Sequence, residues 1–196
     1  MSGSIHLTRS GKHVALLEID NPPSNTLGTA MRAKFREILD ALAVDLSVRA
    51  LVVTGRGSAF CSGDDLREEF EAADTGRDRG ANLLDFGRLF DQLESFRAPV
   101  IAAVNGCCVG GGLELALCCD VRLASREARF VCAGVNVGLM ASVYRLPRLI
   151  GVARAKHMLL TGNPLRAPAD EKRRCEPRRR WSRGSACAAG KGERPA

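Results

Sequence analysis

The stretch "NGCCVGGGLELALCCD", from Asn105 to Asp120, places three consecutive glycines between a short apolar run and a helix-like run. Glycine costs a helix about 1 kcal/mol relative to alanine, so three of them are an unfavourable way to begin one. Bare backbone at this point lets a ligand oxygen approach main-chain N–H groups at the positive end of a helix. Neither the GxxxxGK[ST] phosphate loop nor the GxGxxG dinucleotide fingerprint fits the stretch. We interpret it as a point of ligand approach.

A second glycine-bearing loop, "SAFCSGDDL" at residues 58–66, also follows a predicted buried strand and leads into a predicted helix. Two strand-end loops of this kind could each offer one N–H to a single carbonyl oxygen. Such a pair of donors is an oxyanion hole, which stabilises negative charge as it develops in a reaction. The two loops together therefore indicate chemistry at a carbonyl group.

Strand-like and helix-like segments alternate along the chain, which predicts an α/β fold with crossover connections. Asp65 is the predicted N-cap of one helix, with Glu68 completing a capping box. Residues 56–64 are expected to form a loop. The expected strands are two within residues 4–20 and one each at 50–55, 99–106 and 121–125. One helix is expected to start at Thr29. Further helices are expected at 65–73, 83–96, 113–120 and 144–162, the last interrupted at Pro147.

Composition favours a globular protein with one core: the chain has 196 residues, of which 45% are hydrophobic. No stretch approaches the ~18 consecutive apolar residues of a membrane span, and the N-terminus lacks an apolar signal region. These features predict a cytoplasmic protein without a membrane partner. Two pairs of its eight cysteines are adjacent and no CxxC occurs, so we expect buried free thiols and no metal site.

The charge is concentrated at one end. Residues 164–196 hold ten Lys and Arg against four Asp and Glu, a balance of +6, whereas the rest of the chain carries only +1 of the total +7. Leu165 is the only Leu, Ile, Val, Met or Phe in this tail. We therefore expect residues 1–163 to form the core and 164–196 to be a disordered basic tail, produced by a frameshift or truncation. A basic arm for nucleic acid or an anionic membrane is the alternative, although a nearly neutral core argues against a nucleic-acid partner.

Three motifs together resemble the crotonase superfamily, the enoyl-CoA hydratase/isomerase family: "AFCSGDDL" (59–66), "PVIAAVNGCCVGGGLELALCCDVRLAS" (99–125) and "GVNVGL" (134–139). The likeness runs from His13 to Gly162. It implies a ClpP/crotonase-like right-handed spiral of ββα units, a homotrimer or hexamer, and an acyl-CoA thioester as substrate. Coenzyme A would then be part of the substrate, with no other cofactor. Family members continue after "LLTG" with amphipathic helices, so this C-terminal helical part is missing or altered here.

The resemblance also implies site residues. The amides of Asp64 and Gly111 would donate to the thioester oxygen, so the Asp64 side chain would not be required. The first loop would contact the adenine and pantetheine of CoA, and the other glycines would lie against the substrate. The residues implicated in this binding are Ser62, Gly63, Asp65, Leu66, Gly110 and Gly112.

Hydratases of this family use two glutamates, and only one is matched here. Glu114 is the expected acid/base; the alternative is a carboxylate that complements the helix dipole. Gly134 occupies the second position, and Ser142 is nearest to the acid of related isomerases. A one-base reaction is therefore expected, which could be a double-bond shift, slow hydration, thioester hydrolysis or decarboxylation. The alternative is a catalytically silent crotonase-like protein that binds CoA or a protein partner.

Overall fold

The computed structural model describes residues 3–68, 79–139 and 142–166. Its larger sheet has the strand order β1-β2-β3-β5-β7. The β1 and β2 strands pair antiparallel, and the other neighbours pair parallel. These strands are β1 (Ser4–Ser10), β2 (Val14–Asp20), β3 (Ala50–Gly55), β5 (Val100–Val104) and β7 (Val121–Ala124).

A smaller sheet, with the order β4-β6-β8-β9, is formed from short strands. Its first three strands are parallel, and the last pair is antiparallel. The strands are β4 (Ala59–Cys61), β6 (Cys107–Val109), β8 (Arg129–Val131) and β9 (Leu165–Arg166). Each of β3, β5 and β7 is thus followed along the chain by one strand of the smaller sheet.

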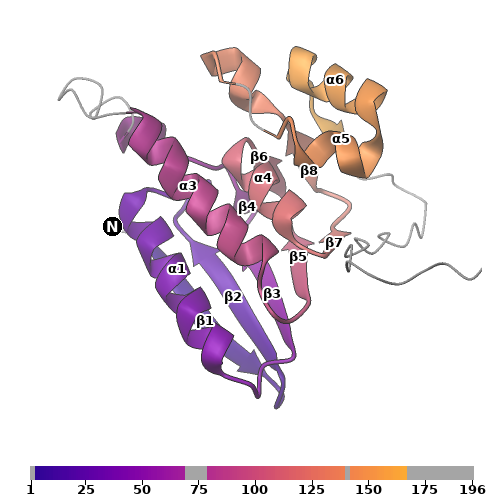
Figure 1. Cartoon of the computed structure of the whole chain (residues 1–196). Coiled ribbons are helices and arrows are strands. Elements are labelled where there is room, and N and C mark those ends of the chain that lie inside the picture. Colours follow the sequence, from indigo (N-terminus) through magenta and orange to yellow (C-terminus); the bar gives the residue numbers. More distant parts are fainter. Residues whose placement is uncertain (1–2, 69–78, 140–141, 167–196) are drawn as a thin grey trace, which may run out of the picture.

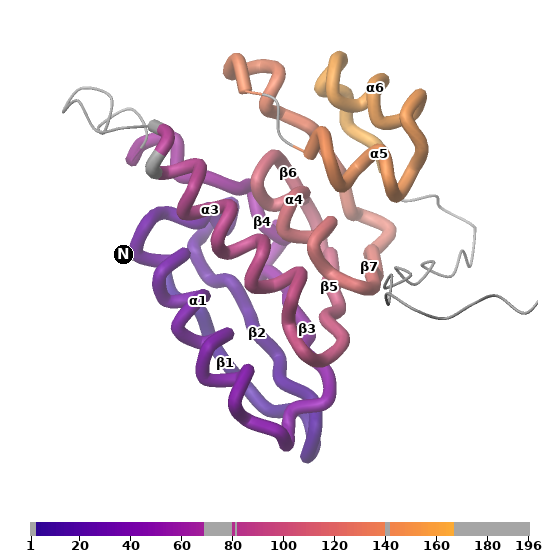
Figure 2. Tube along the Cα trace, in the orientation of Figure 1, coloured from indigo at the N-terminus to yellow at the C-terminus, as the bar shows by residue number. Residues whose placement is uncertain are grey.

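Helices follow these strand pairs and complete a series of ββα units, the predicted α/β architecture. In Figure 1, α1 and α3 lie side by side over one face of the larger sheet, whereas α5 and α6 pair with each other elsewhere. The trace in Figure 2 shows α4 beside α3, with β6 leading into it. The helices are α1 (Thr29–Val44), α3 (Arg79–Glu94), α4 (Gly111–Cys118), α5 (Arg145–Ile150) and α6 (Val152–Thr161), with a 3₁₀ helix at Ala133–Val137.

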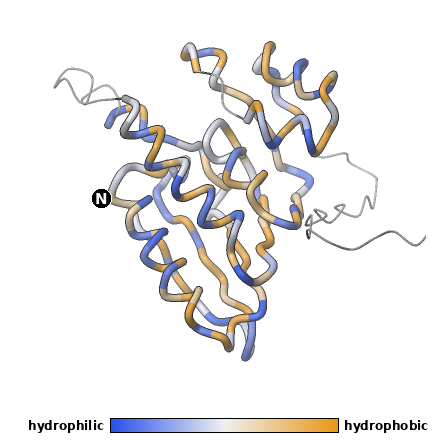
Figure 3. The backbone as a smooth tube through the Cα atoms, viewed as in Figure 1, coloured by the Kyte–Doolittle hydropathy of each residue, from blue (hydrophilic) through white to orange (hydrophobic). Residues whose placement is uncertain are grey.

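The core lies between α1, α3 and the larger sheet. Apolar residues run along the central strands and the inner faces of the helices (Figure 3). In β2, alternate residues are buried because successive side chains of a strand point to opposite faces. The predicted apolar stripe of α1 is confirmed, since all of its members are buried: Met31, Phe35, Ile38, Leu39 and Leu42.

Two helix boundaries differ from the sequence predictions. Pro147 does not interrupt a helix, because it lies in the first turn of α5, where no intrahelical N–H bond is needed. The break falls at Gly151, whose φ of 83° separates α5 from α6. Similarly, α4 begins at Gly111, inside the glycines, and not at residue 113.

The predicted capping box is half right. Asp65 Oδ1 accepts a hydrogen bond from the Arg67 amide at 3.0 Å, so Asp65 does cap the helical residues 66–68. Glu68 does not reach back to Asp65. Its Oε2 accepts from the Thr29 amide at 2.8 Å, at the start of α1, because the fold places that helix start nearby.

Two segments expected to lack strands contribute to the smaller sheet. The predicted loop at 56–64 contains β4, and Leu165 and Arg166 of the predicted tail pair with β8. The remainder of that tail lies outside the described residues. Within the described part of the chain, no helix is long and apolar enough to cross a membrane.

Candidate active site

The two sequence-predicted loops lie side by side because the strands that precede them are parallel neighbours. Cys61 of β4 is paired with Cys108 of β6, so both loops leave the same edge of the smaller sheet. We call residues 61–66 and 110–112 the glycine loops. Their contact is tight: a Cβ added to Gly63 would lie 2.5 Å from the Gly111 nitrogen. A side chain at Gly63 would therefore cover that amide.

Each of the three consecutive glycines meets a different requirement. Gly110 has φ 53° and ψ −118°, a backbone conformation that L side chains rarely adopt. A Cβ on Gly112 would lie 2.0 Å from the Cys61 carbonyl oxygen, so this glycine allows α4 to pack on β4. A Cβ on Gly111 would lie 3.1 Å from the Gly63 Cα and 3.4 Å from the Phe86 ring, so this glycine allows the two loops to approach each other closely. Bare backbone therefore has a packing role at Gly111 and Gly112 and a conformational role at Gly110.

The amide nitrogen of Asp64, in the first glycine loop, lies close to Gly111 of the second. A Cβ placed on this residue would lie 3.6 Å from the Asp64 nitrogen. Gly111 is also the first residue of α4, where an amide has no acceptor within the helix. The positive end of the helix and the Asp64 amide therefore border the same space, which suits an oxygen with developing negative charge.

The first glycine loop is fixed to the segment before α1. The Ser62 amide donates to the Ser24 carbonyl at 3.1 Å, and the Leu27 amide donates to the Gly63 carbonyl at 2.7 Å. Thr26 also forms a β-bridge with Gly63 and donates its hydroxyl to Asp65 at 3.3 Å. These contacts hold the main chain of the loop in one conformation before any ligand binds.

The side chain of Asp64 has a structural role that the sequence did not reveal. Arg32 is only 1% exposed, and its Nη1 donates to Asp64 Oδ1 at 3.0 Å. Asn82 also donates to the Asp64 carboxylate, at 2.6 Å. Arg32 further contacts Asp85 Oδ2 at 2.8 Å and the Leu27 carbonyl at 2.8 Å. We call these five residues the Arg32 network; it connects the first glycine loop to α1 and α3.

Glu114 lies in the first turn of α4 and is only 5% exposed. Its Oε1 accepts a 2.6 Å hydrogen bond from Nη1 of Arg145, at the start of α5. Its Oε2 is buried and has no hydrogen-bond partner within the described residues. The carboxylate is therefore held at one oxygen and available at the other, and it is not a solvated helix-end charge.

The other residues implicated in CoA binding differ in how exposed they are to solvent. The Ser62 hydroxyl is buried without a partner among the described residues, whereas Leu66 is 47% exposed.

Cys61 is fully buried, and burial raises the pKa of its thiol to about 12, although the Gly63 amide lowers it slightly. A thiolate nucleophile is thus disfavoured there. Within the described ranges, no three His, Cys, Asp or Glu side chains are grouped to hold a metal ion.

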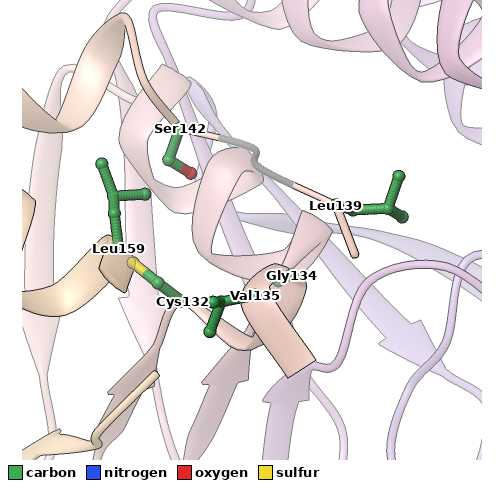
Figure 4. Close-up of a pocket in the computed structure, with 7 residues that line it drawn as sticks. Cys132, Gly134, Val135, Leu139, Ser142 and Leu159 are labelled. Atoms are coloured by element: carbon green, nitrogen blue, oxygen red, sulfur yellow. The ribbon is translucent and has the colours of Figure 1, made fainter. Parts of the chain in front are cut away.

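A small pocket lies beside the second glycine loop. Figure 4 shows Cys132 and Leu159, which belong to different segments, among its lining residues. Gly134, which the family resemblance matched to the second glutamate, also lines it, and a Cβ there would lie 2.5 Å from the Leu139 carbonyl oxygen. The backbone around Gly134 therefore has no room for a glutamate. Ser142, with φ 62°, lines the same pocket.

Sequence reasoning missed Arg32 and Arg145. The sequence did contain a signal for Arg32, because this residue lies three positions before Phe35 and seven before Leu39, on the apolar face of α1. A charged residue on such a face needs a buried partner. Arg145 had no equivalent signal, since its partners come from α3 and α4, distant in sequence.

Comparisons with known proteins agree on one family. A family model described as enoyl-CoA hydratase/isomerase matches residues 9–174. A Bacillus subtilis protein named probable enoyl-CoA hydratase is 36% identical over 156 residues, 78% of this chain and 60% of its own length. The fatty acid oxidation complex subunit alpha of Shewanella halifaxensis is 36% identical over 174 residues, 85% of this chain and 24% of that one.

A solved structure gives the same result for the fold. The crystal structure of enoyl-CoA hydratase from Bacillus anthracis superposes with a TM-score of 0.75 at 31% identity, covering 83% of this chain and 64% of the other. This chain therefore covers only part of its relatives: it spans about 60% of the length of the Bacillus subtilis protein.

Proposed function

The chain belongs to the enoyl-CoA hydratase/isomerase family, and we propose that it acts on an acyl-CoA thioester through an enolate-like intermediate. In this proposal the thioester oxygen accepts hydrogen bonds from the amides of Asp64 and Gly111. The observation that supports it most directly is the closeness of the Asp64 amide to Gly111, the first residue of α4. Coenzyme A enters as part of the substrate, and a homotrimer or hexamer remains the proposed assembly.

The proposed hole works because its donors are fixed in advance. Main-chain hydrogen bonds hold Ser62 and Gly63, and the Arg32 network holds the Asp64 side chain. Donors that need no reorganisation stabilise developing charge more than solvent does, and removing one such donor costs about 10²–10³ in kcat. The remaining contacts proposed for CoA are Ser62, Gly63, Asp65, Leu66, Gly110 and Gly112.

Glu114 supplies proton transfer in this proposal. In a double-bond shift, its carboxylate removes the proton from C4 of a 2-enoyl thioester, and the electron pair moves to the thioester oxygen as a dienolate. The same carboxyl group then returns the proton to C2, which leaves the double bond between C3 and C4. The glutamate regains its charge, so the cycle balances with one base.

Hydration with the same residue also balances. Glu114 takes a proton from water as the water oxygen bonds to C3, and the thioester enolate then receives that proton at C2. A Cβ at Gly134 would lie 2.5 Å from the Leu139 carbonyl oxygen, which supports the proposal that Glu114 performs both transfers. We therefore propose that a double-bond shift or slow hydration is favoured over the fast two-glutamate hydration.

The test is turnover of the full chain with 2-enoyl-CoA thioesters of several chain lengths, with product identification by mass and double-bond position. We expect slow, saturable conversion that Glu114→Gln lowers by about 10²-fold without loss of CoA binding. A catalytically silent CoA-binding protein is the alternative, since Glu114 is already engaged by Arg145. Retained CoA affinity with no turnover on any thioester would establish that alternative.

A further inference from the structure

We propose that Arg145 is a positioning residue for Glu114: it holds Oε1, so that Oε2 is the oxygen that receives the proton. The inference rests on the proposed function, because that function gives Glu114 a proton to accept. Arg145 lies outside both glycine loops, on a helix that neither loop leads into.

A buried carboxylate without a partner is strongly disfavoured in its charged form. The Glu114 side chain is only 7% exposed, and every residue of α4 from Gly112 to Cys118 is buried. The Arg145 side chain is 13% exposed and approaches to 2.6 Å. A charge-assisted bond of this length offsets desolvation, whereas removal of one partner would leave an uncompensated charge. Arg145 is therefore the partner that compensates this buried side chain.

Arg145 is itself held in place by α3. Its Nε donates to Glu94 Oε2 at 2.7 Å, its Nη2 lies 2.6 Å from the same oxygen, and Asp91 lies 3.4 Å from Nη2. The guanidinium also lies 6.0 Å from the centre of the Phe90 ring. The planar guanidinium thus offers one edge to α3 and a separate nitrogen to Glu114. This arrangement fixes the carboxylate in position as well as in charge.

The two oxygens of Glu114 are therefore not equivalent. Oε1 is used by Arg145, and Oε2 is buried with no hydrogen-bond partner within the described residues. A buried acceptor without a partner costs free energy, and such groups in folded proteins call for an explanation. A substrate proton or a reacting water would satisfy it. We assign the proton transfer to Oε2 for this reason.

Few other titratable groups face this pair. The thiols of Cys118, on the same helix, and Cys132, before the 3₁₀ helix, interact with the Glu114 charge. Burial raises the pKa of both thiols, so they stay neutral across the pH range of the assay. The helix α3 contributes Glu94 and Asp91 behind Arg145. Within the described residues, the Arg145 guanidinium is thus the cation in direct contact with Glu114.

The first experiment is a double-mutant cycle on kcat with 2-enoyl-CoA. Arg145→Met should lower kcat by about 10- to 100-fold, because a displaced or protonated carboxyl group no longer accepts the proton. In a Glu114→Gln background the same change should have little further effect, since Arg145 acts through Glu114. A purely structural role would lower kcat by the same factor in both backgrounds and would overturn the proposal.

The second experiment compares kcat with KM for 2-enoyl-CoA. Because Arg145 contacts Glu114 and not the glycine loops, Arg145→Met should lower kcat and leave KM within about twofold of its original value. The matched control is Arg148→Met, which should leave both constants unchanged, because the exposed Arg148 donates to the carbonyl of Tyr144, the residue before α5, and stacks on its ring. A raised KM with unchanged kcat in Arg145→Met would refute the positioning role.

Two outcomes distinguish a failure of this inference from a failure of the proposed function. If Glu114→Gln leaves turnover unchanged, the proposed function of Glu114 fails, and the role of Arg145 fails with it. If Glu114→Gln is severe but Arg145→Met is mild, only the positioning role fails. Should Arg145→Met not fold, Arg145→Lys still decides. It keeps the positive charge but loses the fork that contacts Glu94 and Glu114 together, so kcat should fall about threefold or more with KM little changed. Unchanged kcat would count against positioning.

Discussion

Main-chain atoms pack against main-chain atoms in the glycine loops, whereas apolar side chains face outward along residues 142–162. In the loops, Gly63 and Gly112 leave no space for a Cβ beside Gly111 and Cys61. In the later segment, Val152 and Leu160 are 60% and 63% exposed. The loops are therefore closely packed, while residues 142–162 expose apolar surface. The proposed oxyanion hole depends on the first region alone, and the pocket depends on both.

Two arginines hold the acidic side chains of the proposed site. Arg32 fixes the side chain of Asp64 in the first loop, and Arg145 fixes Glu114 at the start of α4. Arg32 is enclosed by α1, α3 and the first loop, whereas Arg145 comes from α5 in the more exposed segment. Changes near Arg32 should therefore affect the fold, and changes near Arg145 should affect turnover.

Arg32→Met should have the largest effect. It leaves the carboxylates of Asp64 and Asp85 without their buried cation, and breaking a buried ion pair at one partner costs about 3–5 kcal/mol. Urea unfolding measures the loss. The matched control is Arg36→Met, since Arg36 also contacts Asp85 but is 34% exposed, and should cost about 1 kcal/mol or less. Equal losses in the two variants would mean that the Arg32 network does not hold the first loop.

Gly111→Val should come next, with an effect on activity. A side chain here would fill the space beside the Asp64 amide, so kcat/KM should fall by about 10²–10³-fold on every acyl chain length alike. The measurement is kcat/KM across 2-enoyl-CoA thioesters, with circular dichroism to confirm folding. A loss that varied strongly with chain length would instead place Gly111 against the acyl chain.

Gly112→Ala should destabilise the fold by about 1–3 kcal/mol, because its Cβ would collide with the Cys61 carbonyl oxygen. Thermal unfolding reports the change. Gly87→Ala in α3 is the matched control, since a Cβ at Gly87 meets no atom within 4 Å. That variant should gain about 0.5–1 kcal/mol from helix propensity. If both variants unfolded at the temperature of the unmodified protein, the tight packing between the loops would be disproved.

Leu160→Ala should have the smallest effect, within about 0.5 kcal/mol, because the side chain is largely exposed. Its neighbour Leu159 is 8% exposed, and Leu159→Ala should cost about 2 kcal/mol or more. Unfolding at several protein concentrations tests the pair. A concentration-dependent loss in Leu160→Ala would show that a second copy covers this surface, which would remove the contrast between the two regions.

Local patterns were sufficient for much of the fold and part of the candidate site. The alternation of periodicities predicted the larger sheet and α1, because a buried stripe at helical or strand spacing depends only on near neighbours in sequence. Short strands were missed, since three residues such as β4 carry too little pattern to distinguish from a loop. Glu68 was assigned to the wrong helix for a related reason: the nearest unsatisfied amide in sequence is not the nearest in space.

The sequence by itself determined the alternation of strands and helices, the glycines at Gly110–Gly112 and the carboxylate at Glu114, because each is a property of consecutive residues. Only the tertiary structure decided that Gly63 touches Gly111, that Arg32 holds Asp64 and that Arg145 holds Glu114. These pairs are separated by 48, 32 and 31 positions in the chain. Long-range partners of this kind carry no local periodicity, and the parallel strands and packed helices that bring them together exist only once the chain has folded.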